Sequence, residues 1–134
     1  MKREIKFRAW DKKNKVMYIK ISALFLEKNA IEGNNNVRCW TGSQILKYNQ
    51  CDIMQYTGLD DKNDKEIYEG DVVKYSNNCE YYNFIGQIEW NYSRMSYIII
   101  GHYHGNLTII AINSNCMDLE VIGNIYENPE LIKN

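Results

Sequence analysis

The stretch from Met54 to Val73 constrains the fold of this chain more than any other segment. Two short apolar and aromatic segments flank a polar turn at Asp60–Lys65, and the second ends in Glu-Gly-Asp before a new apolar run. Gly70 permits a sharp corner there, and Asp71 can accept hydrogen bonds from nearby amides before the next strand begins. Strands and turns in this order are typical of a small β domain. The stretch offers no evident nucleophile, base or metal cage, so it predicts an architecture and names no reaction.

The N-terminus predicts a β-hairpin. In Ile5–Trp10 the side chains alternate with a period of two, as they do in a half-buried strand. Asp11–Lys15 is the expected turn, and Val16–Ile21 returns as the second strand. The expected inward side chains are Ile5, Phe7 and Ala9, and the expected outward ones are Glu4, Lys6, Arg8 and Trp10.

Residues 22–50 have the least regular pattern. Ala23–Glu27 is either a strand or a short helix, and Gly33–Asn36 predicts a loop because Gly and Asn tolerate a left-handed backbone. Val37–Trp40 is expected to be a short strand, and Ser43–Tyr48 to make one helical turn. We therefore expect an irregular insertion here, mounted on a rigid frame.

The second half predicts a β meander. Five strands at a spacing of about 10–12 residues, joined by short turns, favour a sheet that curls into a small closed barrel filled by its own branched and aromatic side chains. Pro129 follows the last strand, where it removes no ladder hydrogen bond. The expected strands are Asp71–Tyr75, Gly86–Tyr92, Ser96–Gly101, Leu107–Ile112 and Leu119–Tyr126.

Composition supports a mainly β protein of one unit. Ile occurs eighteen times and Tyr eleven times, whereas Ala occurs only four times, and this bias suits a sheet better than helices. The 134 residues fit a single unit, 1–134, with the hairpin and insertion in residues 1–57 and the barrel in residues 58–134.

The charge is unevenly distributed along the chain. The formal net charge is −1, but residues 1–20 hold eight basic and two acidic side chains, a charge of +6, and the rest of the chain holds −7. Such a split indicates either a basic arm for nucleic acid or a surface complementary to the protein's own acidic part. In the second case the acidic part belongs to the same molecule or to a neighbour in an oligomer.

Cysteine usage and the N-terminus point to a reducing cytoplasm. The four cysteines are widely spaced and form no Cys-x-x-Cys motif, so we expect free thiols in a reducing compartment. Charged residues interrupt the N-terminus before any signal-peptide core can form. No apolar run approaches the roughly 18 residues of a membrane span, so no membrane association is expected.

Three segments together resemble the YopX family. They are Ile5–Asp11 followed by Met17-Tyr18, then Met54–Val73, and finally Leu119–Leu131. The resemblance implies a small protein encoded by a phage or prophage and located in the cytoplasm of the bacterial host cell. It also implies an SH3-like small barrel in the C-terminal half that begins at Glu69–Val73. The family has no established activity, so the resemblance implies no catalytic residues.

The acidic turn Asp60–Glu66 is superficially similar to a calcium loop. Counted from Asp61, the third ligand position holds the ammonium group of Lys65, and the Gly and final Glu of such loops are missing. A solvated turn is therefore expected, with carboxylates whose pKa values stay ordinary because water screens them.

Other candidate sites are incomplete. His102 and His104 would form half of a zinc site on one strand, but Gly101 and Gly105 indicate a loop tip there. Each cysteine would need a basic partner to act as a nucleophile, and buried neutral thiols are the expectation. The cysteines are Cys39, Cys51, Cys79 and Cys116. No catalytic residue, metal site or cofactor is predicted, and an enzyme is not expected.

The outward face of the first strand combines the cations of Lys6 and Arg8 with the aromatic ring of Trp10. This mixture suits single-stranded nucleic acid, whereas a solvated strand with Trp10 packed on a neighbour is the simpler alternative. Exposed aromatic residues favour protein interfaces as well. We expect a non-enzymatic phage accessory protein that binds itself or a host or phage protein; the alternative is nucleic-acid binding through the basic hairpin.

Overall fold

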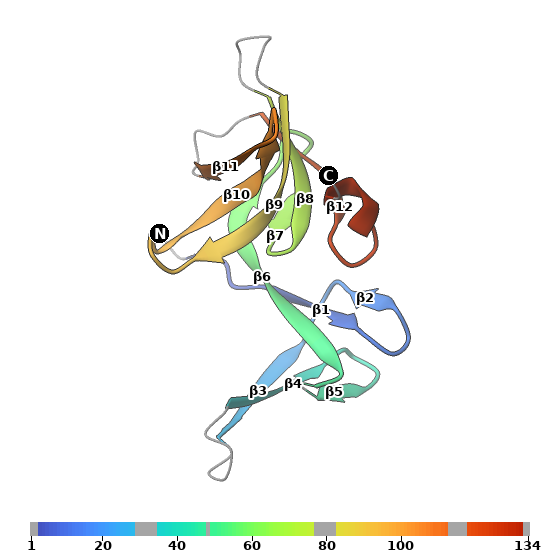
Figure 1. Cartoon of the computed structure of the whole chain (residues 1–134). Helices are drawn as coiled ribbons and strands as arrows, with labels where there is room; N and C mark the ends of the chain where they lie inside the picture. The colour runs from blue at the N-terminus through green and yellow to red at the C-terminus, as the bar shows by residue number, and fades with distance from the viewer. Residues whose placement is uncertain (1–2, 29–34, 48, 77–82, 113–117, 133–134) are drawn as a thin grey trace. The chain divides into compact units, whose positions relative to one another are not determined.

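The chain forms two compact units. A computed structural model describes residues 3–28, 35–47, 49–76, 83–112 and 118–132. The N-terminal unit comprises Glu4–Gln55, and the barrel unit comprises Tyr56–Asn134 together with residues 1–3. Strand β6 (Cys51–Asp60) contributes to both, since its first half pairs with β1 and its second half with β7. The mainly β prediction is confirmed (Figure 1).

The N-terminal unit begins with the predicted hairpin. Strand β1 (Phe7–Asp11) pairs antiparallel with β2 (Val16–Tyr18) and, along its other edge, with β6. The Asp11 carboxylate closes the turn, because its Oδ1 accepts hydrogen bonds from the amides of Lys13 and Asn14 at 3.0 and 3.1 Å. These amide donors explain why the turn forms at this position.

The predicted half-buried alternation of β1 is wrong. Arg8, Ala9 and Trp10 are successive residues, and all are buried, with Arg8 8% and Trp10 7% exposed. Strand β1 lies between β2 and β6, and a central strand can be covered on both faces. The Nε atom of Arg8 donates to Met54 Sδ at 3.4 Å. Ile5 lies before the strand and is exposed.

Residues 22–50 hold a regular sheet where an irregular insertion was expected. Strands β3 (Ala23–Lys28), β4 (Asn35–Trp40) and β5 (Ile45–Lys47) pair antiparallel in that order. Ala23–Glu27 is thus a strand, and the predicted strand at Val37–Trp40 is confirmed as part of β4. Part of the predicted loop at 33–36 lies outside the described residues, and its last two residues belong to β4.

The helical turn predicted at Ser43–Tyr48 is wrong, since residues 45–47 pair with β4. Thr41 directs the chain into a tight turn before β5, because its Oγ1 accepts a hydrogen bond from the Gln44 amide at 3.2 Å. Gly42 supplies the positive φ of 95° that this turn needs. Cross-strand pairing therefore overrides the local helical preference.

A small core closes the N-terminal unit. Leu24 of β3, Cys39 of β4 and Leu46 of β5 form one cross-strand row, since Cys39 lies opposite both of the others. They pack with Ala9 and Cys51, which come from β1 and β6. The sheet therefore has one face turned to this core and the other turned away from it.

The barrel unit contains every strand predicted in the second half. After β7 (Glu66–Tyr68), the strands are β8 (Asp71–Ser76), β9 (Asn83–Asn91), β10 (Ser96–Tyr103), β11 (Asn106–Ala111) and β12 (Leu119–Asn124). The last described element is a short 3-10 helix, η1 (Pro129–Ile132). Within the described ranges, no helix reaches the length and hydropathy that crossing a membrane requires. Of the short turns expected between these strands, 113–115 lies outside the described residues. The turn expected at 76–78 also lies outside them except for Ser76, which is the last residue of β8.

The sheet of this unit curls but does not close. Its order is β11-β10-β9-β8-β12, so the last strand returns to pair with the first, as Figure 1 shows. Among the described strands, β11 and β12 are the two edges, and the expected closed barrel is instead a half-barrel.

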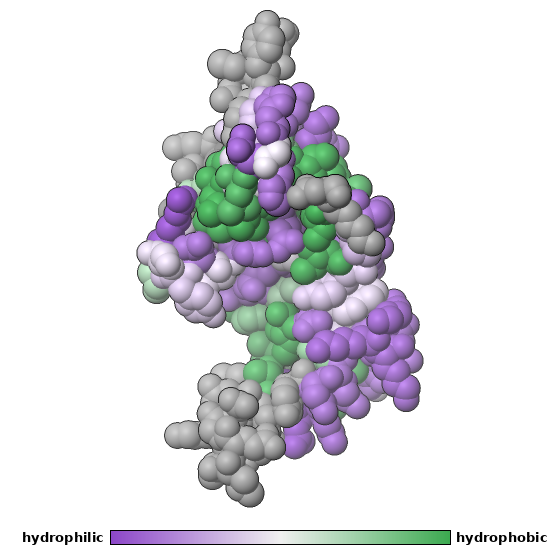
Figure 2. Space-filling model, in the orientation of Figure 1, coloured by the Kyte–Doolittle hydropathy of each residue, from purple (hydrophilic) through white to green (hydrophobic). Residues whose placement is uncertain are grey.

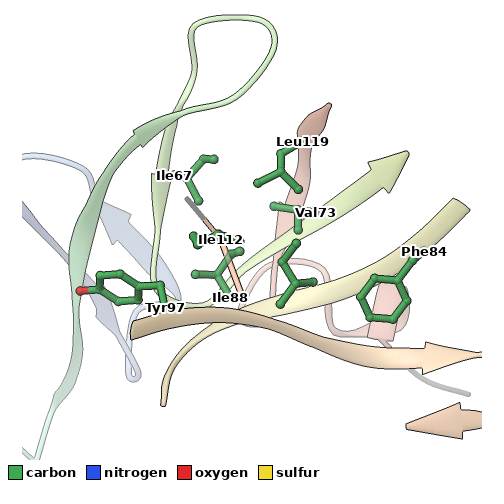
Figure 3. Close-up of a cluster of buried hydrophobic side chains, with 8 residues drawn as sticks. Ile67, Val73, Phe84, Ile88, Tyr97, Ile112 and Leu119 are labelled. Atoms are coloured by element: carbon green, nitrogen blue, oxygen red, sulfur yellow. The ribbon is translucent and has the colours of Figure 1, made fainter. Parts of the chain in front are cut away.

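Branched and aromatic side chains fill the concave side of the half-barrel. Figure 3 shows Ile67, Val73 and Leu119 pointing toward a common centre from different strands. Tyr97 belongs to the same cluster. Its ring packs edge-on against the ring of Trp90, with 5.0 Å between the ring centroids. The other members are Phe84, Ile88, Ile99 and Ile112.

Two buried carboxylates organise the segment that the sequence singled out. Asp71 Oδ2 accepts the Tyr68 amide at 2.8 Å, while Gly70, with φ 80°, donates its amide to Ile88 O at 2.9 Å. Asp61 is also buried rather than screened by water. Its oxygens accept three backbone amides, from Asn63, Lys65 and Val121, at 2.8 to 2.9 Å.

The expectation of an ordinary pKa for this turn is wrong at Asp61. Burial by itself raises the pKa of the carboxyl group, but the amide of Val121 and those of Lys65 and Asn63 together outweigh it. The pKa of Asp61 is therefore lowered. The carboxylate is held by backbone amides, which is a structural use of the acidic turn.

A candidate binding groove on the half-barrel

A groove of about 330 Å³ lies on the barrel unit, over β9, β10 and β11 and beside η1. Its edges are formed by Ile85, Leu107 and Ile132, large apolar side chains that are 43%, 62% and 37% exposed. Figure 2 shows hydrophobic residues gathered over the part of this unit where Figure 1 draws β10 and β11. Exposed apolar side chains around a concavity mark a site that binds another molecule.

Strand register brings the lining residues together. On the convex face, Ile100 of β10 lies opposite Gln87 of β9, and His102 lies opposite Leu107 of β11. These positions alternate with the core residues of the same strands, so they face away from the core. The remaining lining residues are Ile85, Gly86, Glu89, Gly101, Leu131 and Ile132.

The C-terminal turn places η1 beside the groove. The side-chain Oδ1 of Asn124 accepts hydrogen bonds from the amides of Tyr126 and Glu127 at 3.0 and 2.8 Å. The backbone carbonyl of Asn124 accepts the Asn128 amide at 2.9 Å. Asn128 O then accepts the Leu131 amide at 3.1 Å. This chain of hydrogen bonds explains why the segment after β12 turns back and brings its apolar residues to the groove.

Two glycines let β9 and β10 approach closely at the floor of the groove. Gly86 and Gly101 lie directly opposite each other. A Cβ atom on Gly101 would lie 2.4 Å from Ile85 O and 2.9 Å from the Gly86 Cα atom. No other residue fits such a close backbone approach.

The polar groups of the groove suit recognition. Gln87 Nε2 donates to Glu89 Oε1, so this carboxylate is already oriented. His102 adds an exposed imidazole on the neighbouring strand. Polar groups placed among apolar side chains in a concavity fix the orientation of a bound chain.

The structure separates the two histidines. The prediction of a loop tip is wrong for His102, which lies in β10, and right for His104, which forms a two-residue turn with Gly105. Both turn residues have positive φ, 50° and 79°, as a tight hairpin requires. The His104 ring packs against the Tyr103 ring, with 4.2 Å between the ring centroids. Over the described residues, no group of three or more potential metal ligands is found.

Two of the cysteines form a buried pair in the N-terminal unit. Cys39 and Cys51 share its core, and Cys51 Sγ donates to Lys47 O at 3.3 Å. Burial, and then the neighbouring Cys39 thiol, raise the pKa of Cys51 to about 12. Burial likewise raises the pKa of Cys39. The expected burial of the thiols is thus confirmed for this pair, while Cys79 and Cys116 lie outside the described residues.

We expect Cys39 and Cys51 to react slowly with iodoacetamide in the folded protein at pH 8, because the thiolate is the reacting form and both thiols are buried. Mass spectrometry of peptides after timed alkylation measures this directly. The same two peptides should be alkylated rapidly in 6 M guanidinium chloride as the matched control. Equal rates with and without denaturant would contradict the burial of the pair.

The face predicted at the N-terminal strand is not assembled. Lys6 Nζ lies 2.9 Å from Glu4 Oε1, and the side chains of Arg8 and Trp10 are buried. Trp10 therefore packs within the protein, which was the simpler alternative. The groove was not predicted, because its lining residues have the same pattern in the sequence as other strand residues. The one available signal was the pair of glycines at strand positions 86 and 101.

Comparison with known proteins decides the family. A family model described as YopX protein matches residues 6–133. The chain belongs to the YopX family. Among solved structures, this YopX-family chain resembles protein EF1440 from Enterococcus faecalis, with a TM-score of 0.53 and 26% identity over 98% of this chain and 100% of that one.

A second solved structure shows the same fold. Protein yopX from Bacillus subtilis matches with a TM-score of 0.57 and 18% identity, covering 96% of each chain. No curated protein matches the chain. The structural likeness extends over nearly the whole of each protein, so the YopX fold includes both units.

Proposed function

We propose that this YopX-family protein is a non-enzymatic accessory protein of a phage or prophage, which acts in the bacterial cytoplasm by binding another protein. The groove of the barrel unit is its binding site, and the ligand is an extended segment with apolar side chains. The exposed apolar rim of Ile85, Leu107 and Ile132 is the observation that carries this proposal.

The size and position of the groove support a peptide segment as the ligand. A volume of about 330 Å³ is near the lower end of the range for ligand pockets, which suits one or two side chains. Strand β11 is a sheet edge among the described strands, so a segment lying beside it can also pair its backbone.

A second copy of the chain is one partner that the charges favour. The N-terminal unit holds nine basic and five acidic side chains, a charge of +4, whereas the barrel unit holds seven basic and twelve acidic ones, a charge of −5. Opposite charges on two units of one chain favour head-to-tail association between copies.

A photo-reactive amino acid at Leu107 tests the proposal in cells that carry the phage genome. We expect cross-linking to a discrete protein, and we expect Ile85→Asp in the same chain to abolish it, because a buried carboxylate at the rim disfavours apolar contact. A product of twice the mass of the 15.9-kDa chain identifies a second copy, which light scattering of the purified protein checks.

The matched control places the same amino acid at Tyr92, an exposed residue of the β9–β10 turn outside the groove. It should give no specific product. The same products from both positions, or products at Leu107 that survive Ile85→Asp, would contradict the groove as the binding site. Circular dichroism of Ile85→Asp confirms that the variant is folded.

A further inference from the structure

The sheet of the N-terminal unit has a second face, directed away from its core. On this side Trp40 lies between Ala23 and Ile45, and Arg38 lies between Phe25 and Lys47, in two adjacent cross-strand rows. The aromatic–basic face is defined as the set Phe25, Arg38, Trp40, Ile45 and Lys47. These residues alternate with the core residues of the same strands.

The aromatic–basic face exposes large apolar groups to solvent. Phe25 is 49% exposed, Trp40 37% and Ile45 52%, while their neighbours in sequence Leu24, Cys39 and Leu46 belong to the core. Two aromatic rings and an Ile gathered on one small sheet face mark an interaction surface.

Charge selects the kind of ligand. Arg38 and Lys47 lie directly opposite each other in the row next to Trp40, and Lys47 is exposed. The unit that holds them has a net charge of +4. Aromatic rings that stack on unpaired bases, with cations placed to meet the phosphates, are the features by which proteins bind single-stranded nucleic acid.

We propose that the aromatic–basic face binds single-stranded nucleic acid, with Phe25 and Trp40 stacking on bases and Arg38 and Lys47 meeting phosphates. This inference goes beyond protein binding by the groove, since it rests on other residues in the other unit. It also differs from binding through the hairpin, whose Arg8 and Trp10 are buried. Bases must be unstacked to reach a flat sheet face, so a duplex is a poor ligand.

Fluorescence anisotropy of the full chain with labelled oligothymidylate and oligouridylate at low salt tests this proposal. Trp40→Ala and Phe25→Ala should each weaken binding about tenfold, whereas Trp40→Phe, which keeps a ring, should retain most of the affinity. Lys47→Ala should reduce the slope of log affinity against log salt by about 0.7.

The controls use residues of the same types elsewhere. Tyr92→Ala removes an exposed ring from the barrel unit, and Lys13→Ala removes an exposed cation from the hairpin turn. Both should leave the affinity for the oligonucleotide nearly unchanged, and a duplex of the same length should bind more weakly.

Absence of binding at low salt would overturn the proposal. So would equal affinity for duplex, or a loss with Lys13→Ala that exceeds the loss with Lys47→Ala, because the hairpin would then be the site. Polyglutamate that binds as tightly as the oligonucleotide, with the same loss in Trp40→Ala, would assign the face to an acidic protein. Since Phe25 and Trp40 are exposed, their variants should stay folded, which circular dichroism verifies.

Discussion

Gly101→Ala is expected to destabilise the barrel unit by about 3 kcal/mol, at the upper end of the cost of overpacking. The added Cβ atom would lie 2.4 Å from Ile85 O, 2.9 Å from the Gly86 Cα atom and 3.0 Å from Phe84 Cε2. The two nearest atoms belong to the backbone of β9, which cannot move aside without breaking its ladder with β10. The substitution should therefore separate the two strands and disturb the groove floor.

Urea unfolding followed by amide hydrogen exchange measures this effect for each unit separately. Gly58→Ala is the matched control, because it is the same change in the same unit at a position with nothing within 4 Å. It costs only the strain of a positive φ, about 1 kcal/mol. A loss for Gly101→Ala no larger than that for Gly58→Ala would contradict the close approach of β9 and β10.

Asp61→Asn is expected to destabilise the barrel unit by about 2–3 kcal/mol at pH 7. The two carboxylate oxygens accept amides from opposite directions, Oδ1 from Asn63 and Lys65 and Oδ2 from Val121. Asn has one oxygen and one NH₂ group, so in either orientation an NH₂ group faces an amide N–H and a buried donor loses its acceptor. The link between the turn and β12 should weaken most.

The acid side of the stability curve provides a second readout for Asp61. Its pKa is lowered in the folded state, so its contribution to stability is present above the unfolded value of 3.8 and is lost as the pH falls through the folded pKa. The difference in free energy of unfolding between wild type and Asp61→Asn should therefore shrink below pH 3.8.

Asp64→Asn is the control for both readouts, because Asp64 is exposed in the same turn and Asn tolerates its positive φ of 61°. Its free energy of unfolding should change by less than about 0.5 kcal/mol. If Asp64→Asn and Asp61→Asn had equal effects at pH 7, the amide cage around Asp61 would not be the source of stability.

Local patterns sufficed for most of the barrel unit. Strand β9 shows a period-two alternation of buried and more exposed side chains, short apolar runs mark β8 and β10, and Gly, Asn or Ser mark the turns between strands. The hairpin at the N-terminus was predictable because the turn-forming Asp11 lies between two segments rich in apolar residues.

The same patterns failed where a strand lacks two distinct environments or is too short to show them. Strand β1 is buried on both faces, so its Arg8 and Trp10 were assigned to solvent, and the three residues of β5 have no measurable period. Formation of β5 depends on its pairing with β4, and a pattern within three residues cannot reveal that pairing.

Neither candidate surface was visible in the order of residues. Ile85 and Leu107 resemble core residues of a strand, and Phe25, Trp40 and Lys47 lie in three separate segments. Alternation says that a side chain faces one side of a sheet, but whether that side is covered depends on which strands lie next to it and where the sheet ends. Strand positions follow from local chemistry, whereas exposure, and with it any binding surface, arises from contacts between residues far apart in the chain.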